Sequence, residues 1–274
     1  MTAGYNGRRL SPPLTRIDGS IPRTQGISLS LLGFAIVIAI WVIATTTHVV
    51  SPLYLPAIPD VISALITQAQ TGDLWSDIGI SVSRILVAFA IAAVMAIPTG
   101  LVAARVRLAD ALVTPLVEFS RYLPVAAFLP LTIIWAGTGE AQKYVVIWIG
   151  TFFALVLMII DDIRRVPPEF IDFGRTLGMS ESRILWKIVL RGAMPNIVDS
   201  LRIAFGWCWT WLILAELVAA TSGIGYRITL GQRYLETNLI FAYILVLGVL
   251  GLLSDQLFRV LHRIAFRYLR KGGL

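Results

Sequence analysis

The sequence contains few of the residues that soluble enzymes use for chemistry. It has one cysteine, Cys208, which excludes an intrachain disulfide, and two histidines, His48 and His262, near opposite faces of the apolar region. These histidines cannot meet in one site, and no H-E-x-x-H sequence occurs. We therefore expect no catalytic residue, no metal ligand and no cofactor. A membrane-embedded enzyme is a weaker alternative than a transporter, and a non-transport scaffold is disfavoured by the charges inside the spans.

Charge and phosphate-binding loops are also scarce. Only 14% of the 274 residues are charged, against about 25% in a typical soluble domain. No G-x-x-x-x-G-K-[ST] loop occurs, so the chain cannot bind ATP in the usual way. The formal net charge of +7 does not indicate nucleic-acid binding, because the basic residues lie in loops beside apolar stretches rather than on one surface.

What is abundant is apolar sequence, at 57% of the residues, gathered into stretches of the ~20 residues that cross a bilayer as a helix. This predicts an all-α polytopic membrane protein with about six transmembrane helices. The first stretch is long enough to be an uncleaved span rather than a signal peptide. The expected spans are Leu29–Thr47, Ile78–Ala104, Ala109–Ala136 interrupted by Pro124 and Pro130, Gln142–Ile160, Ile197–Ala220 and Leu239–Leu261.

Basic residues favour one side of these spans. Lys143, Arg227 and Arg233 lie on one side, and the opposite side holds Arg8, Arg9, Arg16, Arg23, Arg105, Arg107, Arg164, Arg165, Arg175, Arg183, Lys187, Arg191, Arg259, Arg263, Arg267, Arg270 and Lys271. The positive-inside rule places the richer side in the cytoplasm. We expect a cytoplasmic tail over residues 1–27, a transmembrane domain over 28–267 with a cytoplasmic loop over 161–195, and a cytoplasmic tail over 268–274.

The outer segment Ser51–Asp77 contains no lysine or arginine. Three prolines predict an extended connector at its start. A short amphipathic helix then opens at Pro59 or Asp60, with apolar residues Val61, Ile62, Leu65 and Ile66 at helical spacing. This helix is either interfacial or part of a gate or docking element.

The cytoplasmic loop predicts two short helices. Pro168 and Glu169 suit the first turn of a helix that runs to Leu177, and Gly178 suits the left-handed residue that ends it. A second helix follows over Ser182–Leu190, ended by Gly192 and Pro195. Its apolar residues, Ile184, Leu185, Ile188 and Val189, lie on one face, and Arg183, Lys187 and Arg191 lie on another.

Two interpretations of this hairpin remain open. A basic amphipathic helix can lie on anionic lipid. A compact pair of helices with a glycine break is more typical of a docking surface for a soluble partner, because a helix lying on lipid needs no such turn.

The same loop resembles the EAA motif of ABC-importer permeases, which reads Glu-Ala-Ala, three residues, Gly, nine residues, Ile-x-Leu-Pro. The matching positions are Asp172, Phe173, Gly174, Gly178, Ile188 and Leu190, with Asp172 in place of Glu, Phe173 and Gly174 in place of the alanines, and Arg191 where proline is usual. Beyond the loop, Leu55-Pro56-x-x-Pro59, Leu74-Trp75, Ser81-x-x-Arg84, Pro124, Pro130-Leu131, Trp135-x-Gly137, Ala215-Glu216 and Ser222-Gly223-Ile224-Gly225-Tyr226 are similar to the nitrate/sulfonate/taurine/bicarbonate importer permeases.

This resemblance covers roughly Trp41–Arg267 and implies a type I ABC importer permease with a cytoplasmic coupling-helix hairpin. It implies two ABC ATPase subunits, a second copy of the permease, an extracytoplasmic solute-binding protein and the inner membrane as partners. Asp172, Gly174, Gly178, Ile188 and Leu190 would couple to the ATPase. The implied cargo is a small anion. The alternative is a secondary transporter or channel that works without an ATPase.

Charged residues inside the spans mark candidate functional positions. Glu118 and Arg121 are three residues apart and either form a structural ion pair beside the kink at Pro124 or leave Arg121 free to attract an anion. Arg202 is a further candidate on the substrate path. We expect Glu216 to pair with Arg84, and Asp255 with Arg202 or Arg259. Trp207, Trp209 and Trp211 are two residues apart, which favours packing over an aromatic substrate cage.

Overall fold

The computed structural model describes residues 23–267, and the expected cytoplasmic tails therefore lie largely outside the described residues. The chain divides into two compact units, residues 1–58 and 59–274. The first unit contains α1 (Arg23–Thr46), whose exposed side chains are apolar on every side, as expected of a helix surrounded by lipid. The Trp41 indole Nε1 donates a hydrogen bond to the Pro56 carbonyl, 2.9 Å away, which ties the end of α1 to the proline-rich connector.

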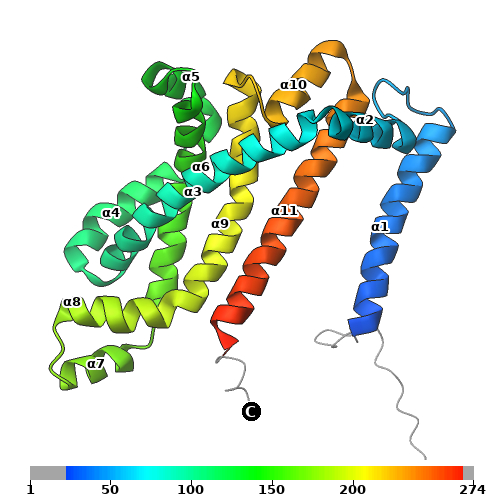
Figure 1. Ribbon diagram of the computed structural model, residues 1–274. Coiled ribbons are helices and arrows are strands. Elements are labelled where there is room, and N and C mark those ends of the chain that lie inside the picture. The colour runs from blue at the N-terminus through cyan, green and yellow to red at the C-terminus, as the bar shows by residue number, and fades with distance from the viewer. Residues whose placement is uncertain (1–22, 268–274) are drawn as a thin grey trace, which may run out of the picture. The chain divides into compact units, whose positions relative to one another are not determined.

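The second unit is a bundle of helices around α3, α6 and α9 (Figure 1). Its elements are α2 (Ile58–Thr71), α3 (Asp73–Arg105), α4 (Arg107–Ser120), α5 (Val125–Ala136), α6 (Glu140–Arg164), α7 (Pro168–Thr176), α8 (Glu181–Ile184), the π-helical turn η1 (Leu185–Val189), α9 (Leu190–Ala219), α10 (Ile224–Tyr234) and α11 (Thr237–Ala265). By length and composition, five helices of the described chain could cross a membrane, and six if α4 and α5 count as one broken span. This confirms the expected all-α membrane fold.

Small residues on α3 let it pack closely against α6. Ala88, Ala92 and Ala96 recur every four residues on one face of α3, and all three are fully buried. Gly100 continues this face, and a Cβ there would lie 2.6 Å from Ile159 Cγ2. The alanine-rich sequence of this span therefore sets the close contact at the centre of the bundle.

The third expected span is interrupted at Pro124, as expected, and consists of two helices, α4 and α5. α4 and α5 meet at an angle of 101° across residues 121–124. Pro124 explains the break, since its ring disfavours helical backbone at the residue before it. Pro130, also expected to interrupt the span, lies inside α5 without ending it.

The expected end of the second loop helix at Gly192 and Pro195 is also wrong. The helix runs on from Glu181 through η1 into α9, with Pro195 inside it. Figure 1 shows this helix leaving α8 beside α7 and turning into α9. The expected outer amphipathic helix is present as α2, but Val61 is its buried residue while Ile62 and Ile66 are exposed.

Candidate functional site

The hairpin formed by α7, α8 and η1 (Pro168–Val189, hereafter the hairpin) ends its first helix as expected. Gly178 has φ +69°, the left-handed region that favours glycine. The Gly178 N–H donates to the Arg175 carbonyl at 2.9 Å, and the Met179 N–H donates to the Gly174 carbonyl at 3.1 Å. These two bonds form a Schellman cap, so the turn between the helices has one defined conformation.

The two halves of the hairpin contact each other at Gly174. A Cβ on Gly174 would lie 2.7 Å from Ile188 Cδ1 and 3.0 Å from Ile184 Cγ1, so the missing side chain allows the helices to approach. Ile188 and Leu190 pack against the core cluster that contains the buried Val189. The structure therefore brings Gly174, Gly178 and Ile188 together as parts of one turn, although they are up to fourteen residues apart.

The opposite surface of the hairpin is exposed and partly apolar. Phe173 is 63% exposed and Leu177 is 62% exposed, and Asp172 is exposed next to them. Arg175 forms a bidentate ion pair with Glu181, with Nε–Oε1 and Nη2–Oε2 distances of 2.9 and 3.2 Å. These hydrogen bonds to the Glu181 carboxylate raise the pKa of Arg175 above its usual value. An exposed apolar patch on a firmly capped hairpin can dock a partner.

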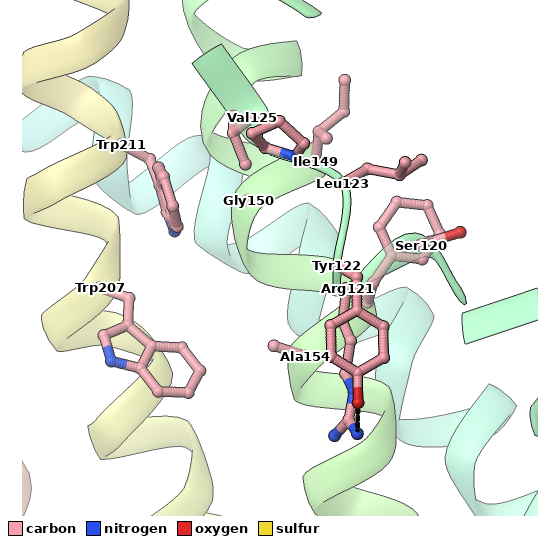
Figure 2. Close-up of a pocket in the computed structure, with 12 residues that line it drawn as sticks. Ser120, Arg121, Tyr122, Leu123, Val125, Ile149, Gly150, Ala154, Trp207 and Trp211 are labelled. Atoms are coloured by element: carbon pink, nitrogen blue, oxygen red, sulfur yellow. Dashed lines mark hydrogen bonds between the residues drawn. The ribbon is translucent and has the colours of Figure 1, made fainter. Parts of the chain in front are cut away.

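A pocket of about 350 Å³ lies at the break between α4 and α5 (Figure 2). Residues 120–125 form one wall, and the other walls come from residues 149, 150, 153 and 154 of α6 and from Trp207 and Trp211 of α9. Residues 149–154 are near the middle of the 25-residue α6, so the pocket is near mid-membrane depth. Irregular backbone at that depth is tolerated where it lines a cavity.

Arg121 is the charged residue in this lining. Of the two alternatives for Arg121, the ion pair with Glu118 is absent from the described chain. Arg121 Nη2 instead donates to the Tyr122 hydroxyl at 2.8 Å, as Figure 2 shows. The guanidinium carbon also lies 4.7 Å from the centre of the Tyr122 ring. Glu118 is exposed one turn earlier on α4 and does not line the pocket. Arg121 therefore lines the pocket without a carboxylate partner in the described part of the chain.

The three tryptophans of α9 divide between two roles. Trp209 is buried and its Nε1 donates to the Ser254 hydroxyl at 3.2 Å, so it packs as expected. Trp207 and Trp211 share the opposite face, one turn apart, and both line the pocket (Figure 2). A Cβ on Gly150 would lie 2.6 Å from the Trp211 ring, so Gly150 makes the space that this ring occupies. Sequence reasoning missed this pair because it considered the two-residue spacing of Trp207, Trp209 and Trp211 and not the four-residue spacing of Trp207 and Trp211.

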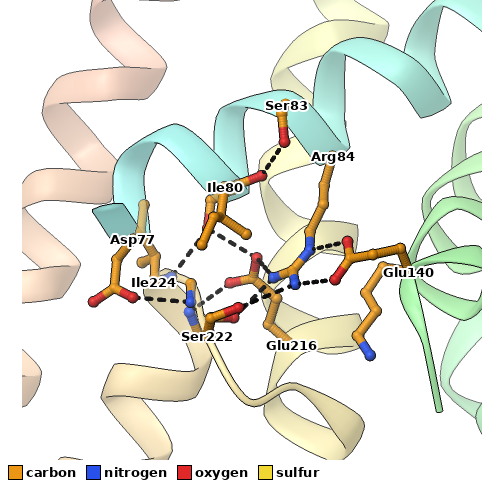
Figure 3. A network of polar contacts seen from close by, with 12 residues as sticks. Asp77, Ile80, Ser83, Arg84, Glu140, Glu216, Ser222 and Ile224 are labelled. Atoms are coloured by element: carbon orange, nitrogen blue, oxygen red, sulfur yellow. Dashed lines mark hydrogen bonds and ion pairs between the residues drawn. The ribbon is translucent and has the colours of Figure 1, made fainter. Parts of the chain in front are cut away.

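A second polar cluster joins α3, α6, α9 and the start of α10 (Figure 3). The expected pair of Arg84 with Glu216 is confirmed, with 2.8 Å between Nη1 and Oε1, and both side chains are buried. Arg84 Nε also donates to Glu140 at 2.7 Å, and Glu216 accepts from the Ser81 hydroxyl at 2.8 Å and the Gly225 N–H at 2.7 Å. These contacts hold four elements together at the end of the bundle away from the hairpin.

The remaining charged candidates lie towards the hairpin end. Arg202 Nη1 lies 3.4 Å from Asp255 Oδ1, and Arg259 Nε lies 2.7 Å from Asp255 Oδ2, so both expected partners of Asp255 are confirmed. Arg202 also contacts Asp199 at 3.6 Å, and it does not line the mid-membrane pocket. The structure does not bring Arg202 together with Arg121.

This combination defines a class: a helical membrane subunit with a broken helix lining a pocket at mid-depth and a capped hairpin projecting from one end. The chain belongs to the family of binding-protein-dependent transport system inner membrane components, whose model matches residues 96–266. It is thus a multi-pass inner-membrane ABC transporter permease, a subunit without catalytic activity that works with an ATPase and a binding protein.

Curated relatives agree with this family, and a solved structure shares the fold. The chain is 31% identical to the taurine transport system permease protein TauC of Escherichia coli over 90% of this chain and 92% of TauC. It is 29% identical to the bicarbonate transport system permease protein CmpB of Synechococcus elongatus over 91% of this chain and 96% of CmpB. A chain of the inward-facing MetNI methionine ABC transporter has the same fold, with a TM-score of 0.64 and 19% identity over 72% of this chain and 98% of that one.

Proposed function

We propose that this permease carries a small anion through the mid-membrane pocket and that Arg121 attracts it. The supporting observation is that the Arg121 guanidinium lies beside the break between α4 and α5 and has no carboxylate partner among residues 23–267. A cation without a carboxylate partner inside a span is costly unless it serves a function. The N-terminus of α5 also begins at this pocket, and the positive end of a helix dipole favours an anion.

The cargo belongs to the nitrate, sulfonate, taurine or bicarbonate group. The named cargoes of TauC and CmpB, taurine and bicarbonate, support this choice. The indole faces of Trp207 and Trp211 give the pocket apolar walls, which suit an anion with a small organic body, such as a sulfonate.

The hairpin is the proposed coupling site. Its capped turn transmits movement because Gly178 and Gly174 hold the two helices in one arrangement, and Ile188 and Leu190 connect it to the bundle core. Asp172, Phe173 and Leu177 would contact the ATPase. Two permease copies would bind two ATPase subunits, and closure of the ATPase pair would open the bundle outward to receive the anion from the binding protein.

The test is uptake by the reconstituted transporter, after the anion has been identified on its binding protein. Arg121→Ala is expected to lower uptake about tenfold or more, which corresponds to the loss of ~1.4 kcal/mol of interaction. Arg263→Ala, at an exposed arginine of α11, is the matched control and leaves uptake near the wild-type rate. Unchanged anion import by Arg121→Ala, or an equal loss in both variants, contradicts the role of Arg121.

A further inference from the structure

A second cavity, of about 560 Å³, lies at the hairpin end of the bundle. Arg105 and Arg107 of the turn between α3 and α4 form one side of it. Asp172 and Arg175 of α7, with Glu181 and Ile184 of α8, form the other. Asp172 belongs both to this lining and to the proposed ATPase surface, whereas the exposed Phe173 and Leu177 lie on another side of α7, so the cavity adjoins that surface without including its apolar residues.

The charges in this cavity are not balanced. Arg175 is already paired with Glu181 and also lies 3.4 Å from Asp172. In contrast, within residues 23–267 neither Arg105 nor Arg107 has a carboxylate at ion-pair distance. Arg105 Nη2 donates only to the carbonyls of Ile163 at 2.6 Å and Val166 at 3.0 Å, and its buried Nε has no partner. Two uncompensated guanidinium groups on one wall favour an anionic ligand.

The position of these arginines indicates where that ligand comes from. Arg105 ends the 33-residue apolar α3, and Arg107 begins α4. Between and beside them, Val106 is 39% exposed and Leu108 is 72% exposed. Arginines adjoining exposed apolar side chains at the end of a span occur at the boundary between lipid headgroups and acyl chains. A phospholipid at this boundary could place its phosphate in the cavity and its acyl chains beside Leu108.

We propose that this cavity binds the headgroup of an anionic phospholipid of the phosphatidylglycerol class. The phosphate accepts hydrogen bonds from Arg107 and from Arg105, whose planar guanidinium groups match phosphate geometry. Such a lipid bridges the α3–α4 turn and the hairpin, so membrane charge influences the element that the proposed function assigns to ATPase coupling. This lipid belongs to the cytoplasmic leaflet if the hairpin end is cytoplasmic, as the positive-inside rule predicts.

The test measures lipid retained by the purified full-length chain in native mass spectrometry, with dioleoyl phosphatidylglycerol and dioleoyl phosphatidylcholine as probes. Wild-type chain is expected to retain phosphatidylglycerol in preference to phosphatidylcholine. Arg107→Gln is expected to lower that retention about fivefold, as for the loss of one basic contact to an anionic headgroup. Arg105→Gln is expected to lower phosphatidylglycerol retention too. If Arg105→Gln does not fold, Arg107→Gln still tests the site, because Arg107 is exposed.

Arg263→Gln is the matched control, because it removes the same charge from an exposed site at the end of α11. Equal loss in Arg107→Gln and Arg263→Gln would mean general attraction to anionic lipid and would overturn the site. Displacement of phosphatidylglycerol by excess inorganic phosphate would assign the cavity to free phosphate and overturn the lipid. Neither result tests Arg121 or anion uptake, so failure of the lipid site can be distinguished from failure of the proposed function.

Discussion

At the scale of single residues, the charged side chains inside the bundle differ in what surrounds them. Arg84 and Glu216 are buried against each other and against hydrogen-bond donors and acceptors of neighbouring elements. Arg121 has a tyrosine hydroxyl and a pocket beside it. The first arrangement holds several elements together, and the second supports the proposal that Arg121 attracts an anion.

Removing the buried Arg84–Glu216 ion pair should lower the free energy of unfolding more than removing the partly exposed Arg84–Glu140 ion pair. Arg84→Gln leaves the Glu216 carboxylate buried without a cation, and we expect a loss of about 3–5 kcal/mol of stability. Glu140→Gln removes a partner whose side chain is 53% exposed, and we expect at most about 1 kcal/mol. Thermal unfolding of the purified variants in detergent compares the two, and equal shifts of Tm would contradict the structural role of the Arg84–Glu216 pair.

Substitutions at Gly178 are restricted by backbone conformation and not by neighbouring atoms. Its φ is +69°, while a Cβ there would meet no atom within 4 Å. Gly178→Val should therefore strain the turn by about 1–2 kcal/mol, misalign the hairpin and abolish ATP-driven uptake, with membrane insertion intact. Gly178→Asn is the control, because asparagine tolerates this region and should retain most uptake. Normal uptake by Gly178→Val would show that the turn geometry is not needed for coupling.

At the scale of elements, two helix irregularities separate the candidate functional regions from the regular bundle. The break between α4 and α5 lines the mid-membrane pocket. The π-helical turn η1 lies where the hairpin continues into α9, and it contains Ile188, which packs on Gly174. π-Helical turns within α-helices often accompany functional sites, which agrees with a coupling role for this one.

The contact between α6 and α9 sets the width of the pocket. Gly150→Ala should push the Trp211 ring away from α6, because the new Cβ would lie 2.6 Å from ring atoms. Since Trp211 lines the pocket, we expect uptake to fall by roughly tenfold, while binding of the ATPase is retained. Gly206→Ala is the control on α9, because nothing lies within 4 Å of a Cβ there. Equal uptake by both variants would show that the position of Trp211 does not limit transport.

At the scale of the whole molecule, the two ends of the second unit differ in chemistry. Helix α10, whose Gly225 belongs to the polar cluster around Arg84, lies at one end, and the hairpin lies at the other (Figure 1). Most basic residues of the loops lie at the hairpin end, which the positive-inside rule therefore predicts to be cytoplasmic.

The orientation can be tested by labelling with a membrane-impermeant maleimide. The native Cys208 is fully buried and should remain unlabelled, which gives a clean background. Ser63→Cys on α2 should react in intact spheroplasts, whereas Ser182→Cys in the hairpin should react only after the membrane is opened. The reverse pattern would invert the proposed topology.

The sequence by itself determined the apolar spans, the side on which basic residues gather, the Gly178 turn and the pair of Arg84 with Glu216. These features depend on local composition, on spacing along the chain, or on the cost of burying a charge without a partner of opposite charge. Only the tertiary structure decided that α4 and α5 diverge by 101°, that Pro195 does not end a helix, and that Trp207 and Trp211 face Arg121 across a pocket. The reason is physical: a proline permits either a kink or a break, and packing against neighbouring helices selects between them.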